Sequence, residues 1–195
     1  MAKITLSQLA HSYLPHPQGP ADYALKRMDH NWQDGGAYSL LGPSGCGKTT
    51  LLNLISGLLV PSEGRILFDD KDVTGLPTAE RNIAQVFQFP VVYDTMSVYD
   101  NLAFPLRNRG ADESYVDARV RKIAEMTDME AVLSKKAQGL TADAKQKISL
   151  GRGMVREDVS AILFDEPLTV IDPQMKWEFR TQLKALHREF GRTMI

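Results

Sequence analysis

The fold of this chain is decided by the stretch Gly42-Pro43-Ser44-Gly45-Cys46-Gly47-Lys48-Thr49, a glycine-rich turn that stands between two apolar runs. Glycines in such a turn let successive backbone N–H groups point at phosphate oxygens, and a following helix adds its positive N-terminal end. We expect Lys48 to reach the β- and γ-phosphates of ATP and Thr49 to offer its hydroxyl to Mg²⁺. The stretch therefore predicts a nucleotide phosphate-binding loop.

The residues on both sides of the loop have the patterns that such a loop needs. Residues 37–41 form a short apolar run after a Gly-Gly pair, which predicts a buried strand. Residues 50–57 carry apolar side chains at helical spacing and end at Gly57, which predicts a helix that stops at this glycine. Further strands are predicted at residues 1–6, 65–68, 83–87 and 161–164.

The pattern becomes helical from about residue 97 to 156. Ser97 with Asp100 resembles a capping box, and Val116, Val120 and Ile123 share one helix face. We therefore expect a helical subdomain at about residues 97–157, inserted into a single domain that spans residues 1–195.

A last helix is predicted after Asp172-Pro173, because aspartate is a good N-cap and proline suits the first helical position. Gly191 should end this helix. Its apolar stripe would consist of Met175, Phe179, Leu186 and Phe190. Residues 193–195 have the pattern of a strand cut off at its beginning, so we expect the domain to be truncated at its C-terminus.

Composition narrows the classes of function. The chain has 195 residues, 43% of them hydrophobic, and a formal net charge of -1 with scattered basic residues, which argues against a nucleic-acid partner. Cys46 is the only cysteine, so no intrachain disulfide can form, and a reducing compartment such as the cytoplasm is expected. No apolar stretch approaches the ~20 residues that span a bilayer, and the N-terminus lacks a secretion signal.

An acidic pair, Asp165-Glu166, follows the apolar run at residues 161–164. Asp165 can hold Mg²⁺ directly or through water, and Glu166 can orient and deprotonate an attacking water. An acidic pair after a strand is on its own the solvated start of a loop. Together with the phosphate loop, it predicts the second half of a magnesium–nucleotide site.

Four short motifs, in the same order along the chain, resemble the nucleotide-binding subunits of ABC transporters, and among them the importers of carbohydrates and polyols such as glycerol. They are residues 42–50 (GPSGCGKTT), 86–88 (VFQ), 165–168 (DEPL) and 191–195 (GRTMI). The resemblance implies an α/β fold with a P-loop NTPase core, which is a RecA-like mixed sheet flanked by helices. It also implies an N-terminal antiparallel β part and an inserted α-helical subdomain.

The resemblance also implies a role for each matching residue. Gln88 resembles the Q-loop glutamine, which senses Mg²⁺ and water, so that Gln88, Glu166 and Lys48 would be catalytic and Thr49, Gln88 and Asp165 would hold the metal. The phosphates of ATP would be bound by Gly42, Pro43, Ser44, Gly45, Cys46, Gly47, Lys48, Thr49 and Thr50.

Three further positions have two interpretations each. Tyr13 stands where the family has the aromatic residue that stacks on adenine, but Tyr23 is a rival because a proline-rich insert blurs the alignment. Either tyrosine can also be an ordinary core or surface residue. Asp172 matches the D-loop aspartate, which crosses the interface between two subunits, and it is also a good helix cap.

The chain departs from the family at its signature motif, Leu-Ser-Gly-Gly-Gln, which aligns with Leu140-Thr141-Ala142-Asp143-Ala144. In the family this helix N-terminus embraces the γ-phosphate held by the other subunit. Thr141 keeps a hydroxyl for that nucleotide, whereas Asp143 brings a carboxylate toward a phosphate. Two like unit charges about 4 Å apart repel by ~1 kcal/mol in water and ~4 kcal/mol at an effective dielectric constant of 20. The alternative is a well-capped helix without a catalytic role, since the helix dipole favours an acid in the first turn.

The resemblance implies an ATP-hydrolysing motor subunit that lies on the inner face of the cell membrane. Its partners would be transmembrane permease subunits, a second ATPase subunit and, indirectly, an extracytoplasmic substrate-binding protein. Residues 89–106 resemble the surface that grips the permease, and ordinary packing of the helical insert is the alternative. Because of Asp143 we expect a heterodimer with a subunit that has an intact signature, although a homodimer stays open. The family's switch histidine would fall about four residues past Ile195.

Two other classes of function stay open. One is a soluble ABC-type ATPase outside transport, which would show tandem ATPase domains or a long coiled-coil insert. The other is a nucleotide-dependent scaffold without turnover. The altered signature favours the scaffold, whereas the presence of Lys48, Thr49, Asp165 and Glu166 argues against it.

Overall fold

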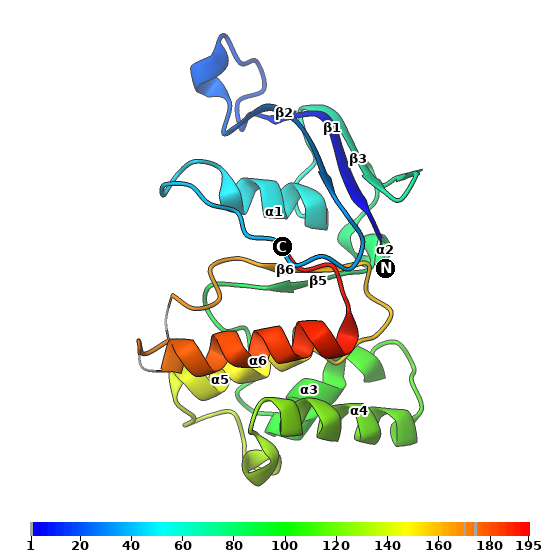
Figure 1. Ribbon diagram of the computed structural model, residues 1–195, viewed down its shortest axis with the longest axis vertical. Coiled ribbons are helices and arrows are strands. Elements are labelled where there is room, and N and C mark those ends of the chain that lie inside the picture. Colours follow the sequence, from blue (N-terminus) through cyan, green and yellow to red (C-terminus); the bar gives the residue numbers. More distant parts are fainter. Residues whose placement is uncertain (1, 170, 174) are drawn as a thin grey trace. The chain divides into compact units, whose positions relative to one another are not determined.

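The computed structural model describes residues 2–169, 171–173 and 175–195, and it shows a mixed α/β chain (Figure 1). The chain forms two compact units. The first consists of residues 1–85, 158–165 and 191–195, and the second of residues 86–157 and 166–190. The expected single domain with an insert at about residues 97–157 stays a prediction.

An antiparallel sheet opens the first unit, with strand order β2-β1-β3-β4. Its strands are β1 (Ile4–His11), β2 (Leu25–Trp32), β3 (Glu63–Phe68) and β4 (Lys71–Asp72). Ile4 of β1 pairs with Trp32 of β2 on one side and with Phe68 of β3 on the other. A single turn of 3-10 helix, η1 (Pro20–Asp22), lies in the proline-rich loop between β1 and β2. The antiparallel N-terminal part that the resemblance implied is therefore present.

Helix α1 (Lys48–Ser56) follows the glycine-rich loop and supplies much of the core of the first unit. In Figure 1 this helix lies beneath the strands of the antiparallel sheet. Leu54 and Ile55 of α1 are completely buried together with Ile4 and Ile66 of the sheet. The helix stops at Gly57, which adopts the left-handed φ of 82°, so the predicted helix end is confirmed.

The strands β5 (Ile83–Val86) and β6 (Ala161–Phe164) pair with each other, and both were predicted. Residues 193–195 lie beside β6: the N–H of Ile162 donates to the carbonyl of Thr193 at 2.9 Å, and the N–H of Phe164 donates to Ile195 at 2.8 Å. The pattern of a strand at residues 193–195 therefore reflects real pairing.

The predicted buried strand at residues 37–41 is wrong. The only β-bridge described in this segment joins Ala37 to Met194, and Leu41 is 92% exposed. A strand requires a continued ladder of backbone partners, and the bridge does not extend toward Leu41. Apolar composition alone could not reveal that the partner was missing.

A buried arginine that the sequence did not reveal holds the far end of α1. Arg81 ends the short helix α2 (Thr78–Arg81) and is 1% exposed. Its Nη1 donates to the carbonyls of Leu54 at 2.6 Å and Ile55 at 3.1 Å. The last carbonyls of a helix have no partner within the helix, so Arg81 caps α1 and complements the negative end of its dipole.

The second unit is helical. It contains α3 (Val98–Arg107), α4 (Glu113–Met126), the 3-10 turn η2 (Glu130–Val132), α5 (Ala142–Met154) and α6 (Met175–Phe190). Ser97 caps α3 by accepting the N–H of Asp100 at 2.9 Å, as predicted. Val116, Val120 and Ile123 are all completely buried, so the predicted helix face of α4 is confirmed.

Helix α6 agrees with its predicted apolar stripe at Phe179 and Leu186, which are buried. The side chain of Met175 and the whole of residue 174 lie outside the described residues. The carbonyl of Asp172 accepts the N–H of Lys176 at 3.1 Å, and the described helix begins at Met175. The role of Asp172 as the N-cap therefore stays a prediction. Across the described ranges, no helix is long and apolar enough to cross a membrane.

Candidate nucleotide site

The glycine-rich loop has the backbone that a phosphate-binding turn requires. Gly45 and Gly47 both lie in the left-handed region, with φ of 80° and 94°. A Cβ atom at Gly47 would stand 2.5 Å from the carbonyl oxygen of Ala24, so only glycine fits there. Gly47 is the N-cap of α1, and the first N–H groups of a helix have no acceptor within the helix. The loop thus ends at a helix N-terminus that can receive an anion.

Lys48 is folded back over this loop. Its Nζ donates to the carbonyl of Gly42 at 2.9 Å and to the carbonyl of Pro43 at 3.0 Å. Both acceptors are neutral, and an ammonium bonds more strongly to an ionised oxygen than to a carbonyl. The ammonium group is therefore held at the loop in a position from which it can exchange these carbonyls for phosphate oxygens.

The hydroxyl of Thr49 and the carboxylate of Asp165 come together in the first unit. Thr49 Oγ1 donates to Asp165 Oδ1 at 3.0 Å, and Asp165 directly follows β6. Hydroxyl and carboxylate oxygens are the hard ligands that Mg²⁺ prefers, and Mg²⁺ completes its shell with water and substrate phosphates. The donor set fits a magnesium ion bound with a nucleotide. Within the described ranges there is no group of three or more His, Cys, Asp or Glu residues that could hold a metal, so any ion here would depend on the nucleotide for further ligands.

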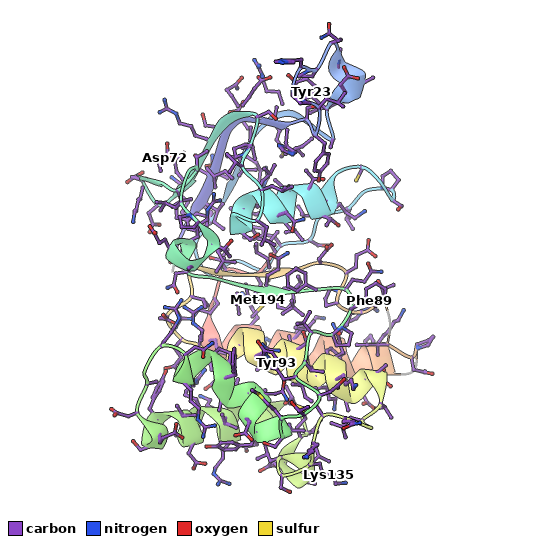
Figure 2. All side chains as sticks on the ribbon, turned by 180° about the vertical axis from the view of Figure 1, so that it is seen from behind. Tyr23, Asp72, Phe89, Tyr93, Lys135 and Met194 are labelled. Atoms are coloured by element: carbon purple, nitrogen blue, oxygen red, sulfur yellow. The ribbon has the colours of Figure 1, made fainter. Side chains whose placement is uncertain are left out.

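The two candidate tyrosines have different surroundings. Tyr13 is 62% exposed, and its ring lies edge-on to that of His11 with the ring centroids 4.8 Å apart. Its hydroxyl lies 3.1 Å from Thr50 Oγ1 in the first turn of α1. Tyr23, which is labelled in Figure 2, instead donates to Glu63, and Glu63 also pairs with Arg27. The hydrogen bond from Tyr23 lowers the pKa of Glu63, and the same contact raises the pKa of Tyr23. Tyr13 is thus the tyrosine beside the phosphate loop.

The proposed general base, Glu166, lies in the second unit and has a strained backbone. Its φ is 46°, which is uncommon for a residue with a side chain. The N–H of Thr169 donates to the carbonyl of Glu166 at 3.1 Å, and Thr169 Oγ1 donates to Glu166 Oε2 at 3.2 Å. Backbone strain of this kind persists only where the surrounding structure enforces it, and it is often found at functional sites.

Gln88, the predicted Q-loop glutamine, lies in a bend two residues after the end of β5 and is half-buried. The residues that follow it are exposed and apolar: Phe89 is 68% exposed and Val91 53%. Tyr93, which is labelled in Figure 2, is held more firmly. The centroid of its ring lies 4.7 Å from that of Phe104, and the guanidinium of Arg152 lies over the ring. The segment at residues 89–93 therefore has an exposed apolar part at Phe89 and Val91 and a packed part at Tyr93.

Helix α5 begins at the altered signature. Thr141 is its N-cap, and the hydroxyl oxygen accepts the N–H of Ala144 at 3.3 Å. Asp143 lies in the first turn, and its Oδ1 is 3.4 Å from the backbone N of Asp172, which donates to it. The carboxylate is therefore directed to the chain's own backbone at Asp172. This contact between the signature and the D-loop position was not foreseen from the sequence.

The structure thus brings together Thr49 with Asp165 and Tyr13 with Thr50 in the first unit, and Asp143 with Asp172 in the second. Cys46 is exposed in the loop as a free thiol. Ser44 and Pro43 are exposed in the same loop. The roles assigned to the site residues of both units stay predictions.

Comparison with known proteins gives a consistent result. The family model described as ABC transporter matches residues 25–169. The trehalose/maltose import ATP-binding protein MalK of Thermococcus litoralis is 41% identical over 178 residues, which are 88% of this chain and 48% of that protein. The sn-glycerol-3-phosphate import ATP-binding protein UgpC of Psychromonas ingrahamii is 38% identical over 195 residues, which are 100% of this chain and 51% of that protein. The chain therefore spans about half the length of these curated relatives.

Solved structures agree with the mixed α/β fold. The structure of cbiO1 from Clostridium perfringens, part of the ABC transporter complex cbiONQ, has a TM-score of 0.86 at 28% identity and covers 98% of this chain and 76% of its own. A nucleotide-free ATP-binding cassette from an ABC transporter has a TM-score of 0.81 at 24% identity and covers 100% and 80%. The second likeness supports the fold alone.

Proposed function

We propose that this chain, which belongs to the ABC transporter family, binds ATP with Mg²⁺ and hydrolyses it as the motor subunit of an importer. The observation that carries the proposal is the hydrogen bond between Thr49 and Asp165. It joins the end of the phosphate loop to the end of β6, from residues 116 positions apart in sequence. Two hard oxygen ligands at a helix N-terminus are what a magnesium nucleotide requires.

Each of the site residues has a defined role in this proposal. The backbone of the phosphate loop and the ammonium of Lys48 bind and orient the phosphates, and Tyr13 stacks on the adenine. Thr49, Asp165 and Gln88 would hold Mg²⁺, which would supply charge neutralisation for the phosphates when bound. Glu166 accepts the proton of the attacking water, and Gln88 orients that water.

A matched pair of variants tests the nucleotide site. Lys48→Ala should lower the affinity for MgATP about 10-fold to 10²-fold, because a hydrogen bond to a charged group contributes about 1.5–3 kcal/mol. Lys71→Ala, which removes an exposed lysine of β4, should leave the affinity unchanged. Equal affinities for the wild type and Lys48→Ala, measured by titration calorimetry on the full-length protein, would contradict the site.

The transport role rests on the relatives, whose names describe import of trehalose/maltose and of sn-glycerol-3-phosphate. We propose a carbohydrate or polyol, such as glycerol or its phosphate, as the cargo. The partners would be transmembrane permease subunits and, indirectly, an extracytoplasmic substrate-binding protein, with this chain on the inner face of the cell membrane. The exposed Phe89 and Val91 would meet the permease, since apolar side chains that gather on a surface mark interaction sites.

The second ATPase subunit is proposed to be a different chain with an intact signature. Asp143 supports this, because its carboxylate lies at the N-terminus of α5, which is where the family binds a partner's phosphate. In this chain that carboxylate accepts the N–H of Asp172. ATPase rates of each subunit alone and of the pair test the idea. A fully active homodimer of this chain would contradict it.

The same contact favours one alternative, a nucleotide-dependent scaffold without turnover. Tight binding of ATP with no release of phosphate, by the chain alone and with its membrane partners, would establish the scaffold instead.

A further inference from the structure

The buried amide of Gln146 joins two segments of the second unit that are far apart in sequence. Gln146 lies in the middle of α5 and is completely buried. Its Nε2 donates to the carbonyl of Pro167 at 2.9 Å and lies 3.5 Å from the carbonyl of Phe87. An amide nitrogen has two hydrogens, so one group can serve both carbonyls.

The orientation of this amide is fixed by its neighbours. Both groups that face it are carbonyl oxygens, which only accept, so the nitrogen must point toward them. Oε1 is buried, and no hydrogen-bond partner for it is found among the described residues. A buried acceptor without a partner is costly, and an apolar side chain of the same size would avoid that cost but would leave the carbonyl of Pro167 without this donor. The glutamine therefore accepts a cost at its own oxygen and holds the carbonyl of Pro167 with its nitrogen.

The two carbonyls belong to the segments that carry the proposed catalytic groups. Pro167 directly follows Glu166, whose φ of 46° has to be enforced by its surroundings. Phe87 directly precedes Gln88. The helix that carries Gln146 starts at the N-cap Thr141, five residues before it. One side chain of α5 thus bonds to the backbone beside Glu166 and approaches the backbone beside Gln88.

We infer that Gln146 is a positioning residue for hydrolysis, which holds the backbone on which Glu166 and Gln88 are mounted. The inference rests on the proposed ATPase function. Gln146 acts through the carbonyls of Pro167 and Phe87, without touching the nucleotide. Removing the amide should therefore misplace the base and the water-orienting glutamine while ATP binding stays as it is.

Gln146→Leu keeps the size of the side chain and removes its two donors. In full-length protein assembled with its membrane partners, kcat for ATP should fall about 10-fold to 10²-fold, as for supporting residues around other catalytic sites. KM for MgATP should change less than about twofold. The matched control is Arg119→Met, since Arg119 is buried and donates to Met154 and Val155 at the other end of α5. This variant should lower Tm and leave kcat unchanged.

Gln146→Glu provides a readout that loss of stability would not move. Burial raises the pKa of a carboxyl group, and only its protonated form can donate to Pro167. The kcat of this variant, relative to the wild type, should rise between pH 8 and pH 6. The ratio for Gln146→Leu should stay flat.

The outcomes separate this inference from the proposed function. A wild-type assembly without ATPase activity would overturn both. An active wild type with Gln146→Leu at the same kcat would overturn the inference and leave the ATPase role intact. A fall in kcat for the control Arg119→Met as large as that for Gln146→Leu would also overturn it, because the effect would then be one of stability.

Discussion

The hydroxyl of Thr49 donates a 3.0 Å hydrogen bond to Oδ1 of Asp165, which ties the first turn of α1 to the residue that follows β6. Both elements lie in the first unit, and α1 packs with Ala161 and Leu163 of β6 in one core. The relative position of the two oxygens is therefore fixed by core packing as well as by their own hydrogen bond. This arrangement is the basis of the magnesium site proposed above.

Asp165→Asn keeps the shape of the side chain and removes its charge. Since a carboxylate binds Mg²⁺ far better than an amide, we expect ATP turnover to fall about 10-fold to 10²-fold. ATP binding measured without Mg²⁺ should be unchanged, because only the metal is affected. Asp69→Asn, in the turn after β3, is the control. An Asp165→Asn enzyme that responds to Mg²⁺ as the wild type does would exclude Asp165 as a ligand.

Tyr13 is expected to stack on adenine, and Tyr23 is not. Tyr13→Ala should weaken ATP binding by about 1–3 kcal/mol, which is the usual range for stacking of a base on an aromatic side chain. Tyr13→Phe keeps the ring and loses only the contact with Thr50, so its affinity should stay near that of the wild type. The same measurement on Tyr23→Ala should show no change. Weaker binding in the Tyr23 variant alone would reverse the assignment.

His11 should make the folded protein less stable at mildly acidic pH. Burial lowers the pKa of His11 from its ordinary value of 6.5. As the pH falls below 6.5, the unfolded chain takes up a proton on this histidine while the folded chain does not. The unfolded state then binds more protons, so stability falls with pH until the lower folded pKa is passed.

His11→Phe keeps a ring beside Tyr13 and removes the titrating group. We expect its Tm to fall less than that of the wild type between pH 7.5 and pH 5.5. His16→Phe, at an exposed histidine in the proline-rich loop, should follow the wild type. Parallel Tm curves for the wild type and His11→Phe would show that His11 does not contribute to the pH dependence.

Asp143 is expected to restrain turnover in a homodimer of this chain. Asp143→Asn removes the charge, and the repulsion of ~1 kcal/mol or more that it would exert on a phosphate corresponds to a gain of about fivefold or more in rate. Asp112→Asn alters an acid at the N-cap of a different helix, α4, and should have no effect. Phosphate release at saturating ATP is the measurement, and an unchanged rate for Asp143→Asn would show that the charge does not reach the nucleotide.

Local sequence signals predicted the elements whose causes are local. Gly57 ends α1 because its backbone is left-handed, and Ser97 begins α3 because its hydroxyl accepts an N–H three residues later. The strand expected at residues 37–41 failed because pairing depends on a distant partner, which meets it only at Met194.

In the candidate site, too, features with local causes could be predicted and contacts between distant residues could not. The phosphate loop could be predicted from neighbouring residues, because Gly45 and Gly47 adopt the left-handed backbone of the turn and α1 follows directly. The bond from Gln146 to Pro167 and the contact of Asp143 with Asp172 join positions 21 and 29 residues apart. No periodicity or spacing reports such pairs. They depend on the three-dimensional course of the backbone.

The most direct test of the proposed ATPase is Glu166→Gln in the full-length protein with its membrane partners, assayed for ATP binding and for phosphate release. Glutamine keeps the size of the side chain but cannot accept the proton of the attacking water. We predict that phosphate release falls about 10²-fold or more while ATP affinity stays within about twofold of the wild type. Turnover equal to that of the wild type would contradict the assignment of Glu166 as the base and, with it, the proposed mechanism.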